Sequence, residues 1–261
     1  MARLPSDRLG QGERANGPTS RPIEAQLSGG VIAIDGPAAS GKSSTARAVA
    51  EALGLAHLDS GSLYRGVTLV ALREAARRGS QTADLAALSP ETILRAAEDR
   101  GLMLQPDGAG FAAYLEGEPV DREIRSAEVT AQVSAVSAIP VVREWINSRL
   151  RALVRAGQDV VVDGRDIGTV VFPDADVKIF LTASPQARAG RRISQRGMPV
   201  QPEGLDAEAA ALAARDHADS TRAVAPLRPA SDAVHLDTTT MDFAEQVRVI
   251  VDRARPIFSR R

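Results

Sequence analysis

The chain has 261 residues, 44% of them hydrophobic and 25% charged, which is typical of a globular protein with a sizeable core. A formal net charge of -1 and 3% aromatic residues argue against nucleic-acid binding, and no apolar run approaches the roughly 20 residues of a membrane span. The chain has no cysteine, so disulfides and thiolate metal sites are excluded. No apolar segment typical of a secretory signal begins the chain, so we expect a cytoplasmic protein without nucleic-acid or membrane partners.

Residues 1–30 are rich in Gly, Pro, Ser, Arg and Gln and have almost no apolar periodicity. Such a segment buries too little apolar surface to offset the entropy lost on ordering. We therefore expect a flexible extension over 1–30, followed by one domain over 31–255.

The first predicted element is a buried strand from residue 31, followed at once by Gly36-x-x-x-x-Gly41-Lys42-Ser43 and a helix to about Leu53. Glycine lets a loop bend around an anion and aim its N–H groups at it. The lysine can reach the outer phosphates of a nucleotide, and the serine can serve Mg²⁺. The alternative, a glycine-rich turn that binds nothing, is disfavoured by the strand and helix patterns on either side.

A second strand–turn–helix unit follows, with an apolar run over 55–58 and a helical stripe over 64–75. Arg65 lies off that stripe near the start of the helix. It faces either the same cleft as the phosphate loop or solvent, and its spacing leaves both open.

Residues 79–124 have a different pattern. Ser89-Pro90 predicts the start of a helix that ends near Arg100, and the runs 102–104 and 111–115 predict a hairpin, with an edge strand beginning near 119. Short strands inserted between helices predict a small subdomain on the main sheet.

A helix over 140–157 leads to the apolar strand 160–162 and then to Asp163-Gly-Arg-Asp166. An apolar strand that ends in aspartate is typical of a second Mg²⁺-associated position in phosphate-loop enzymes. Arg165 and Asp166 are expected to point different ways, so that one can hold a phosphate while the other contacts another group.

After a strand over 177–181, a helix from Ser184 carries four arginines whose spacing predicts a single basic face: Arg188, Arg191, Arg192 and Arg196. A Gly- and Pro-rich break at 197–204 follows. The combination favours a hinged, arginine-bearing lid over the alternative of a solvated basic face.

The last elements are a helix over roughly 205–217, a strand over 233–236 and a closing helix. The first of these helices delivers Arg215, Asp219 and Arg222 near its end. Strands that alternate with helices predict an α/β fold with a parallel sheet covered on both faces. Ligands of such a sheet lie outside the carboxyl ends of its strands.

Four segments together resemble the bacterial cytidylate kinases: Ile34-Asp-Gly-Pro-Ala-Ala-Ser-Gly-Lys-Ser43, Leu58-Asp-Ser-Gly-Ser-Leu-Tyr-Arg65, Asp163-Gly-Arg-Asp-Ile-Gly-Thr-Val-Val-Phe-Pro173 and Arg222-Ala-Val-Ala-Pro-Leu227. The resemblance implies a P-loop NTPase-type α/β fold with a five-stranded parallel core flanked by helices, an inserted monophosphate-binding subdomain and a short mobile lid. The expected core comprises 31–60, 140–184 and 215–255, with the monophosphate-binding region over 61–139 and the lid over 185–214.

The implied reaction is Mg²⁺-dependent transfer of the γ-phosphoryl group of ATP to CMP or dCMP by a monomeric enzyme. A P-loop kinase for another small acceptor, such as UMP, gluconate or shikimate, is the rival interpretation. A switch GTPase is disfavoured because the guanine-binding motif Asn-Lys-x-Asp is absent from the sequence.

The resemblance also implies roles for individual residues. The donor site comprises Gly36, Pro37, Ala38, Ala39, Ser40, Gly41, Lys42, Ser43 and Ser44. The catalytic cations are Lys42, Arg165, Arg188 and Arg192, and the Mg²⁺ positions are Ser43 and Asp163. The acceptor site comprises Ser60, Arg65, Arg165 and Arg222 for the phosphate, Arg215 and Asp219 for the ribose, and Ser134, Arg143 and Asp166 for cytosine.

Overall fold

The structure is a computed structural model that describes residues 29–79, 85 and 88–259. Most of the expected N-terminal extension therefore lies outside the described residues. Its last two residues belong to the fold: Gly29 and Gly30 are buried, and the Gly30 N–H donates to Asp159 Oδ1 over 2.5 Å.

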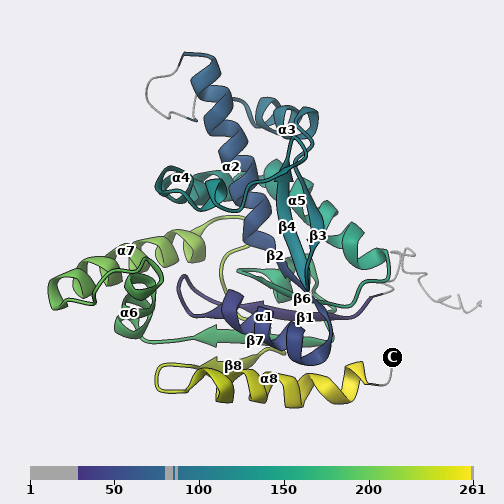
Figure 1. Cartoon of the computed structure of the whole chain (residues 1–261), viewed down its shortest axis with the longest axis vertical. Helices are drawn as coiled ribbons and strands as arrows, with labels where there is room; N and C mark the ends of the chain where they lie inside the picture. Colours follow the sequence, from purple (N-terminus) through teal and green to yellow (C-terminus); the bar gives the residue numbers. More distant parts are fainter. Residues whose placement is uncertain (1–28, 80–84, 86–87, 260–261) are drawn as a thin grey trace, which may run out of the picture.

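A single sheet of eight strands organises the described chain, in the order β3-β4-β2-β6-β1-β7-β8, with β5 paired to β4 (Figure 1). The parallel core comprises β1 (Val31–Asp35), β2 (Ala56–Asp59), β6 (Val160–Gly164), β7 (Val177–Thr182) and β8 (Val234–Asp237). The predicted hairpin consists of β3 (Met103–Asp107) and β4 (Gly110–Leu115), with β5 (Glu118–Pro119) at its side. It extends the main sheet, because β4 pairs with β2 in parallel at His57 and Gly110.

Helices cover both faces of the sheet, as the alternation predicts. One face packs α1 (Lys42–Leu53) and α8 (Phe243–Phe258) around Ile32 and Ile34. The other packs α2 (Ser60–Arg77), α3 (Pro90–Asp99), α4 (Ala127–Ser137) and α5 (Pro140–Arg155) around Val31 and Ala33. The strand β1 alternates between two cores because successive side chains of a strand point to opposite faces.

The helices α6 (Pro185–Gln195) and α7 (Pro202–Thr221) pack on each other beside the phosphate loop. The break between these helices is expected over 197–204, but it ends earlier in the structure. Helix α7 begins at Pro202, because proline suits the first position of a helix, and it continues to Thr221.

The segment after β6 has a structure that the periodicity does not predict. After β6 the chain makes a short π-helical turn, η3 (Ile167–Val171). The buried Asp35 carboxylate at the end of β1 accepts from the N–H groups of Ile167 and Gly168, each over 2.8 Å. This carboxylate therefore holds the segment that presents Arg165 and Asp166.

Candidate functional site

The loop between β1 and α1 has the backbone of a phosphate cradle. A Cβ on Gly36 would lie 2.1 Å from the carbonyl oxygen of Leu181, so no larger residue fits there. Gly41 has a φ of +94°, a value that favours glycine. Helix α1 begins at Lys42, which turns its N-terminus toward the loop.

Lys42 is almost fully buried, and its Nζ donates to the Pro37 carbonyl oxygen over 2.9 Å. Burial, followed by the positive charge of Arg165, lowers the pKa of Lys42 to about 7. A bound anion would favour the charged ammonium form of Lys42, so this side chain suits a phosphate ligand.

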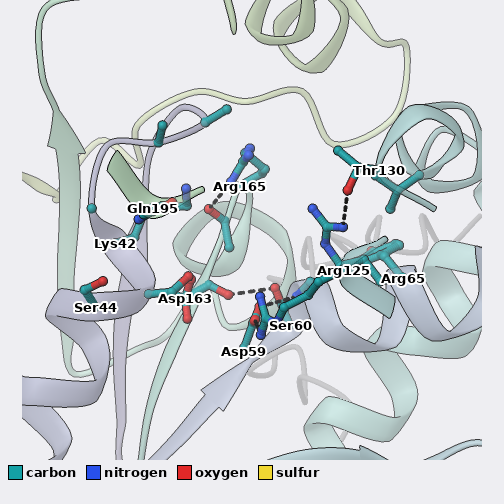
Figure 2. Close-up of a pocket in the computed structure, with 18 of the residues that line it drawn as sticks. Lys42, Ser44, Asp59, Ser60, Arg65, Arg125, Thr130, Asp163, Arg165 and Gln195 are labelled. Atoms are coloured by element: carbon teal, nitrogen blue, oxygen red, sulfur yellow. Dashed lines mark hydrogen bonds and ion pairs between the residues drawn. The ribbon is translucent and has the colours of Figure 1, made fainter. Parts of the chain in front are cut away.

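A cavity of about 1150 Å³ lies at the carboxyl ends of β1, β2 and β6 and reaches α2, α4, α6 and α7 (Figure 2). The expected site residues that line it are Ala38, Ala39, Gly41, Lys42, Ser43, Ser44, Ser60, Arg65, Ser134, Arg143, Asp163, Arg165, Asp166, Arg192, Arg215, Asp219 and Arg222. Those that are not part of its lining are Gly36, Pro37, Ser40 and Arg188. The two ends of the expected site thus share one cavity.

Asp163, at the end of β6, contacts the phosphate-loop helix. Ser43 Oγ donates to its Oδ2 over 2.5 Å, and the backbone carbonyl of Asp163 accepts from Ser60 Oγ over 2.7 Å. Burial opposes ionisation of the carboxyl group, but hydrogen bonds from His57 and Ser43 and the charge of Lys42 outweigh it and lower the pKa of Asp163. A carboxylate and a hydroxyl group side by side at a phosphate loop suit Mg²⁺, which prefers oxygen ligands and completes its coordination with substrate phosphates.

A buried charged cluster surrounds Asp166. Its Oδ2 accepts a hydrogen bond from Arg143, and its Oδ1 lies 3.5 Å from Arg222. The Arg143 guanidinium lies 5.3 Å from the centre of the Tyr64 ring. Three buried atoms here have no hydrogen-bond partner among the residues that the structure describes: Tyr64 Oη, Arg143 Nε and Arg222 Nη2. Buried polar atoms of this kind are usually satisfied, so they mark the cluster as a place for a polar ligand.

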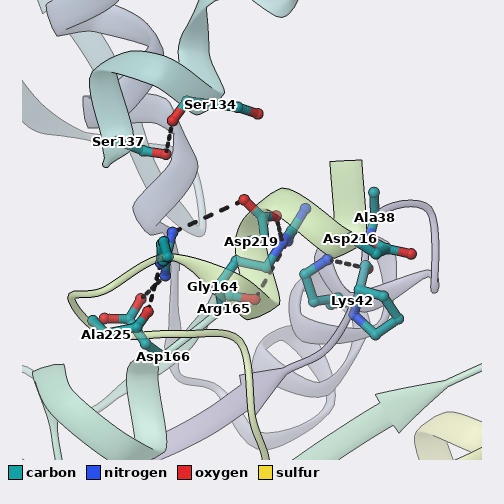
Figure 3. A network of polar contacts seen from close by, with 12 residues as sticks. Ala38, Lys42, Ser134, Ser137, Gly164, Arg165, Asp166, Asp216, Asp219 and Ala225 are labelled. Atoms are coloured by element: carbon teal, nitrogen blue, oxygen red, sulfur yellow. Dashed lines mark hydrogen bonds and ion pairs between the residues drawn. The ribbon is translucent and has the colours of Figure 1, made fainter. Parts of the chain in front are cut away.

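The neighbouring residue Arg165 turns to a different partner, as expected. Its Nε donates to Asp219 Oδ2 over 2.9 Å, which joins the end of β6 to α7 (Figure 3). Arg215, one helical turn before Asp219, has a buried Nε that finds no hydrogen-bond partner within the described part of the chain. Burial, with the charge of Arg165, lowers the pKa of Arg215.

Arg65 faces the cavity rather than solvent, which resolves the two alternatives that its spacing left open. Its Nη1 donates to the carbonyl oxygen of Ile124 over 3.0 Å and to Thr130 Oγ1 over 2.9 Å (Figure 2). Burial lowers the pKa of Arg65 to about 10. Arg125, which the sequence analysis did not select, lines the same wall and lies 3.3 Å from Asp59 Oδ2.

The four arginines whose spacing predicts one basic helical face have different partners in the structure. Arg188 is buried and donates to the carbonyl oxygens of Ala183 and Ala38, each over 3.1 Å, and to Asp216. Arg191 donates to Thr238 Oγ1 over 3.0 Å, whereas Arg192 and Arg196 line the cavity. The tight packing of α6 on α7 and on the phosphate loop distributes these side chains among separate partners.

The cytidylate kinase family model matches residues 32–256. The chain belongs to the cytidylate kinase family. Curated cytidylate kinases of this family include those of Rhodococcus jostii, 47% identical over 81% of this chain and 88% of the relative, and Mycobacterium leprae, 47% identical over 85% and 94%. The cytidylate kinase of Streptomyces griseus is 43% identical over 89% and 95%. Among the residues that the structure describes, no helix has the length and apolarity needed to cross a bilayer.

Proposed function

We propose that this member of the cytidylate kinase family transfers the γ-phosphoryl group of ATP to CMP or dCMP, giving ADP and CDP or dCDP. The observation that carries the proposal is the single cavity that joins the phosphate loop to the buried Asp166 cluster. A general phosphate-loop kinase needs the first of these features. The Asp166 cluster offers both a carboxylate and guanidinium groups, so it can pair with a base that carries both hydrogen-bond donors and acceptors.

On the donor side, the backbone of 36–44 surrounds the ATP phosphates and Lys42 binds their outer oxygens. Lys42 lies in the first turn of α1 and lines the cavity, and this position supports the role. The glycine geometry lets the backbone approach the phosphates closely.

Mg²⁺ is held by Ser43 and Asp163 together with the nucleotide phosphates. The donor set supports this assignment, because a hydroxyl and a carboxylate oxygen lie 2.5 Å apart beside the loop. When bound, the ion neutralises charge that develops on the transferring phosphoryl group.

On the acceptor side, Arg65, Arg165 and Arg222 bind the monophosphate beside Ser60, and Arg215 with Asp219 contacts the ribose. Cytosine is recognised by Ser134, Arg143 and Asp166. A carboxylate accepts from the N4 amino group of cytosine, whereas uracil carries a carbonyl oxygen at that place. Two acceptors would then face each other in a buried site, and such a mismatch discriminates strongly.

The lid proposal assigns different tasks to the two predicted lid arginines. Arg192 lines the cavity and is the one that approaches the transferring group. Arg188 is turned to Asp216 and the phosphate loop, so it fixes α6 to α7 and to that loop. The mobile lid is proposed to extend over 185–214.

Catalysis consists of alignment and charge stabilisation, because phosphoryl transfer leaves little covalent chemistry for the protein. The nucleophile is an oxygen of the acceptor phosphate, and no side chain becomes phosphorylated. A monomer is sufficient for this proposal, since every residue assigned a role comes from one chain. The nucleotide substrates support the cytoplasm as the compartment.

The test is ADP release from ATP and Mg²⁺ with CMP, dCMP, UMP, AMP, GMP or shikimate as acceptor, with Lys42→Ala as the blank. We expect fast turnover confined to CMP and dCMP. Turnover with another acceptor alone would leave the phosphate-loop chemistry intact and exclude the cytosine site. Slow hydrolysis that does not depend on the acceptor would exclude kinase function.

A further inference from the structure

The side chain of His57, on β2, lines the cavity beside Asp163, and the proposed function assigns it no task. Its Nε2 lies 2.8 Å from Asp163 Oδ1, and His57 is 6% and Asp163 2% exposed. A hydrogen bond to an ionised carboxylate is stronger than one between neutral groups, and at a buried place water hardly competes for it. His57 therefore restricts the orientation of the Asp163 carboxylate.

The two oxygens of this carboxylate contact different elements. Oδ1 meets His57 of β2, and Oδ2 meets Ser43 in the first turn of α1. Figure 2 shows Asp163 between Lys42 and the end of β2. Fixing one oxygen thus also fixes the direction in which the other meets the phosphate loop.

The backbone of His57 is held from both sides. It pairs with Val161 of β6, and its N–H donates to the Ala109 carbonyl oxygen over 3.1 Å. A Cβ on the paired Gly110 would lie 2.7 Å from the His57 carbonyl oxygen, so the close approach of the inserted hairpin requires glycine there. The backbone contacts on both sides therefore fix the position from which the His57 side chain extends.

We propose that His57 is a positioning residue for phosphoryl transfer, which holds Asp163 in the orientation that serves the Ser43 hydroxyl group and Mg²⁺. The proposal rests on the proposed function. His57 acts through Asp163 by donating its Nε2–H, and no proton is transferred. If the imidazole is removed, Asp163 Oδ1 loses its partner and the carboxylate is free to rotate away from Ser43.

The first test compares His57→Leu, which removes the donor, with His57→Gln, whose amide N–H replaces Nε2–H. Loss of a partner that orients a metal ligand typically lowers metal affinity or activity by about 10- to 100-fold. We expect His57→Leu to lower kcat by that order and to raise the Mg²⁺ concentration for half-maximal rate, with little change in the KM for CMP. His57→Gln should recover most of the loss. His235→Leu, on the remote strand β8, is the matched control and should behave like the unmodified protein.

A second measurement does not depend on turnover. Binding of Mn²⁺ to the protein in the presence of ADP, followed by electron paramagnetic resonance, should weaken in His57→Leu and recover in His57→Gln. In an Asp163→Asn background, His57→Leu should cause no further loss. Should His57→Leu not fold, as judged by circular dichroism, His57→Asn takes its place, because its shorter amide does not reach Asp163.

Equal defects in the Gln and donor-lacking variants would overturn the proposal, as would unchanged Mn²⁺ affinity or a defect confined to the KM for CMP. Failure of the proposed function is a separate outcome. The unmodified protein would then not phosphorylate CMP, while the Mn²⁺ titration would still test whether His57 positions Asp163.

Discussion

The Asp166 carboxylate accepts a hydrogen bond from the Arg143 guanidinium, and both side chains are buried and line the cavity. Because the Asp166 carboxylate only accepts hydrogen bonds, we expect Asp166→Asn to lower kcat/KM for CMP. The preference for CMP over UMP should also become smaller. The measurement is kcat/KM for both nucleotides under identical conditions. Asp232→Asn removes a surface carboxylate and is the control. An unchanged ratio of CMP to UMP would exclude this role for Asp166.

The two lid arginines should respond differently to removal. Arg192→Ala takes a cation from the cavity wall and should lower kcat by about 10²- to 10³-fold with little change in Tm. Arg188→Ala leaves Asp216 without its cation where α6 meets the phosphate loop, so it should also lower Tm by several degrees. Steady-state kinetics and thermal unfolding of both variants check the contrast. Equal effects on Tm would contradict it.

We expect Lys42 to lower the stability of the folded protein although it is needed for activity. Burial lowers its pKa to about 7, so at lower pH the folded protein carries a buried charge that the unfolded chain carries in water. We expect Lys42→Met to abolish turnover and to raise Tm, most clearly below pH 7. Thermal unfolding at pH 6 and pH 9 tests this. A variant less stable than the unmodified protein at pH 6 would refute it.

Asp35 makes stability depend on pH. Burial is the largest cause that raises the pKa of this carboxyl group from 3.8 to about 6. Between these two pH values the folded state binds more protons than the unfolded state. The contribution of Asp35 to the free energy of unfolding is therefore full below pH 4, and it falls by at most about 3 kcal/mol as the pH rises through 6. Urea unfolding of Asp35→Asn should lack this fall, whatever its absolute stability. The same pH slope in both proteins would show that another group is responsible.

The local patterns are sufficient to predict most of the fold. The central strands β1 and β6 are buried on both faces and read as short apolar runs, and glycine and lysine mark the phosphate loop. The hairpin is predicted by its turn residues, but its pairing with β2 is not. That contact joins His57 to Gly110 over 53 residues, and no local signal reports it.

The site is predicted less completely, because side-chain partners depend on tertiary packing. Arg188 and Arg192 look equivalent in a basic helix, and only the approach of α7 separates a buried anchor from a cavity residue. Asp35 sits at the end of an ordinary apolar strand, and its importance comes from the π-helical turn of a distant segment. His57 likewise gains significance only when β2 lies beside β6.

The alternation of β1 between two cores has a consequence for how the protein opens. Ile32 packs with α1 and α8 while Ala33 packs with the helices of the opposite face, so neither core can be exposed without disturbing the same strand. We expect amide hydrogens in both cores to exchange through one cooperative opening. In the described part of the chain, the buried apolar cluster between helices α6 and α7 is small and comprises Ala38, Ala189 and Leu212, so the amide hydrogens of these helices should exchange through a separate opening of lower free energy. With such a difference, helices α6 and α7 would open and close many times beside the site while the rest of the molecule stays folded.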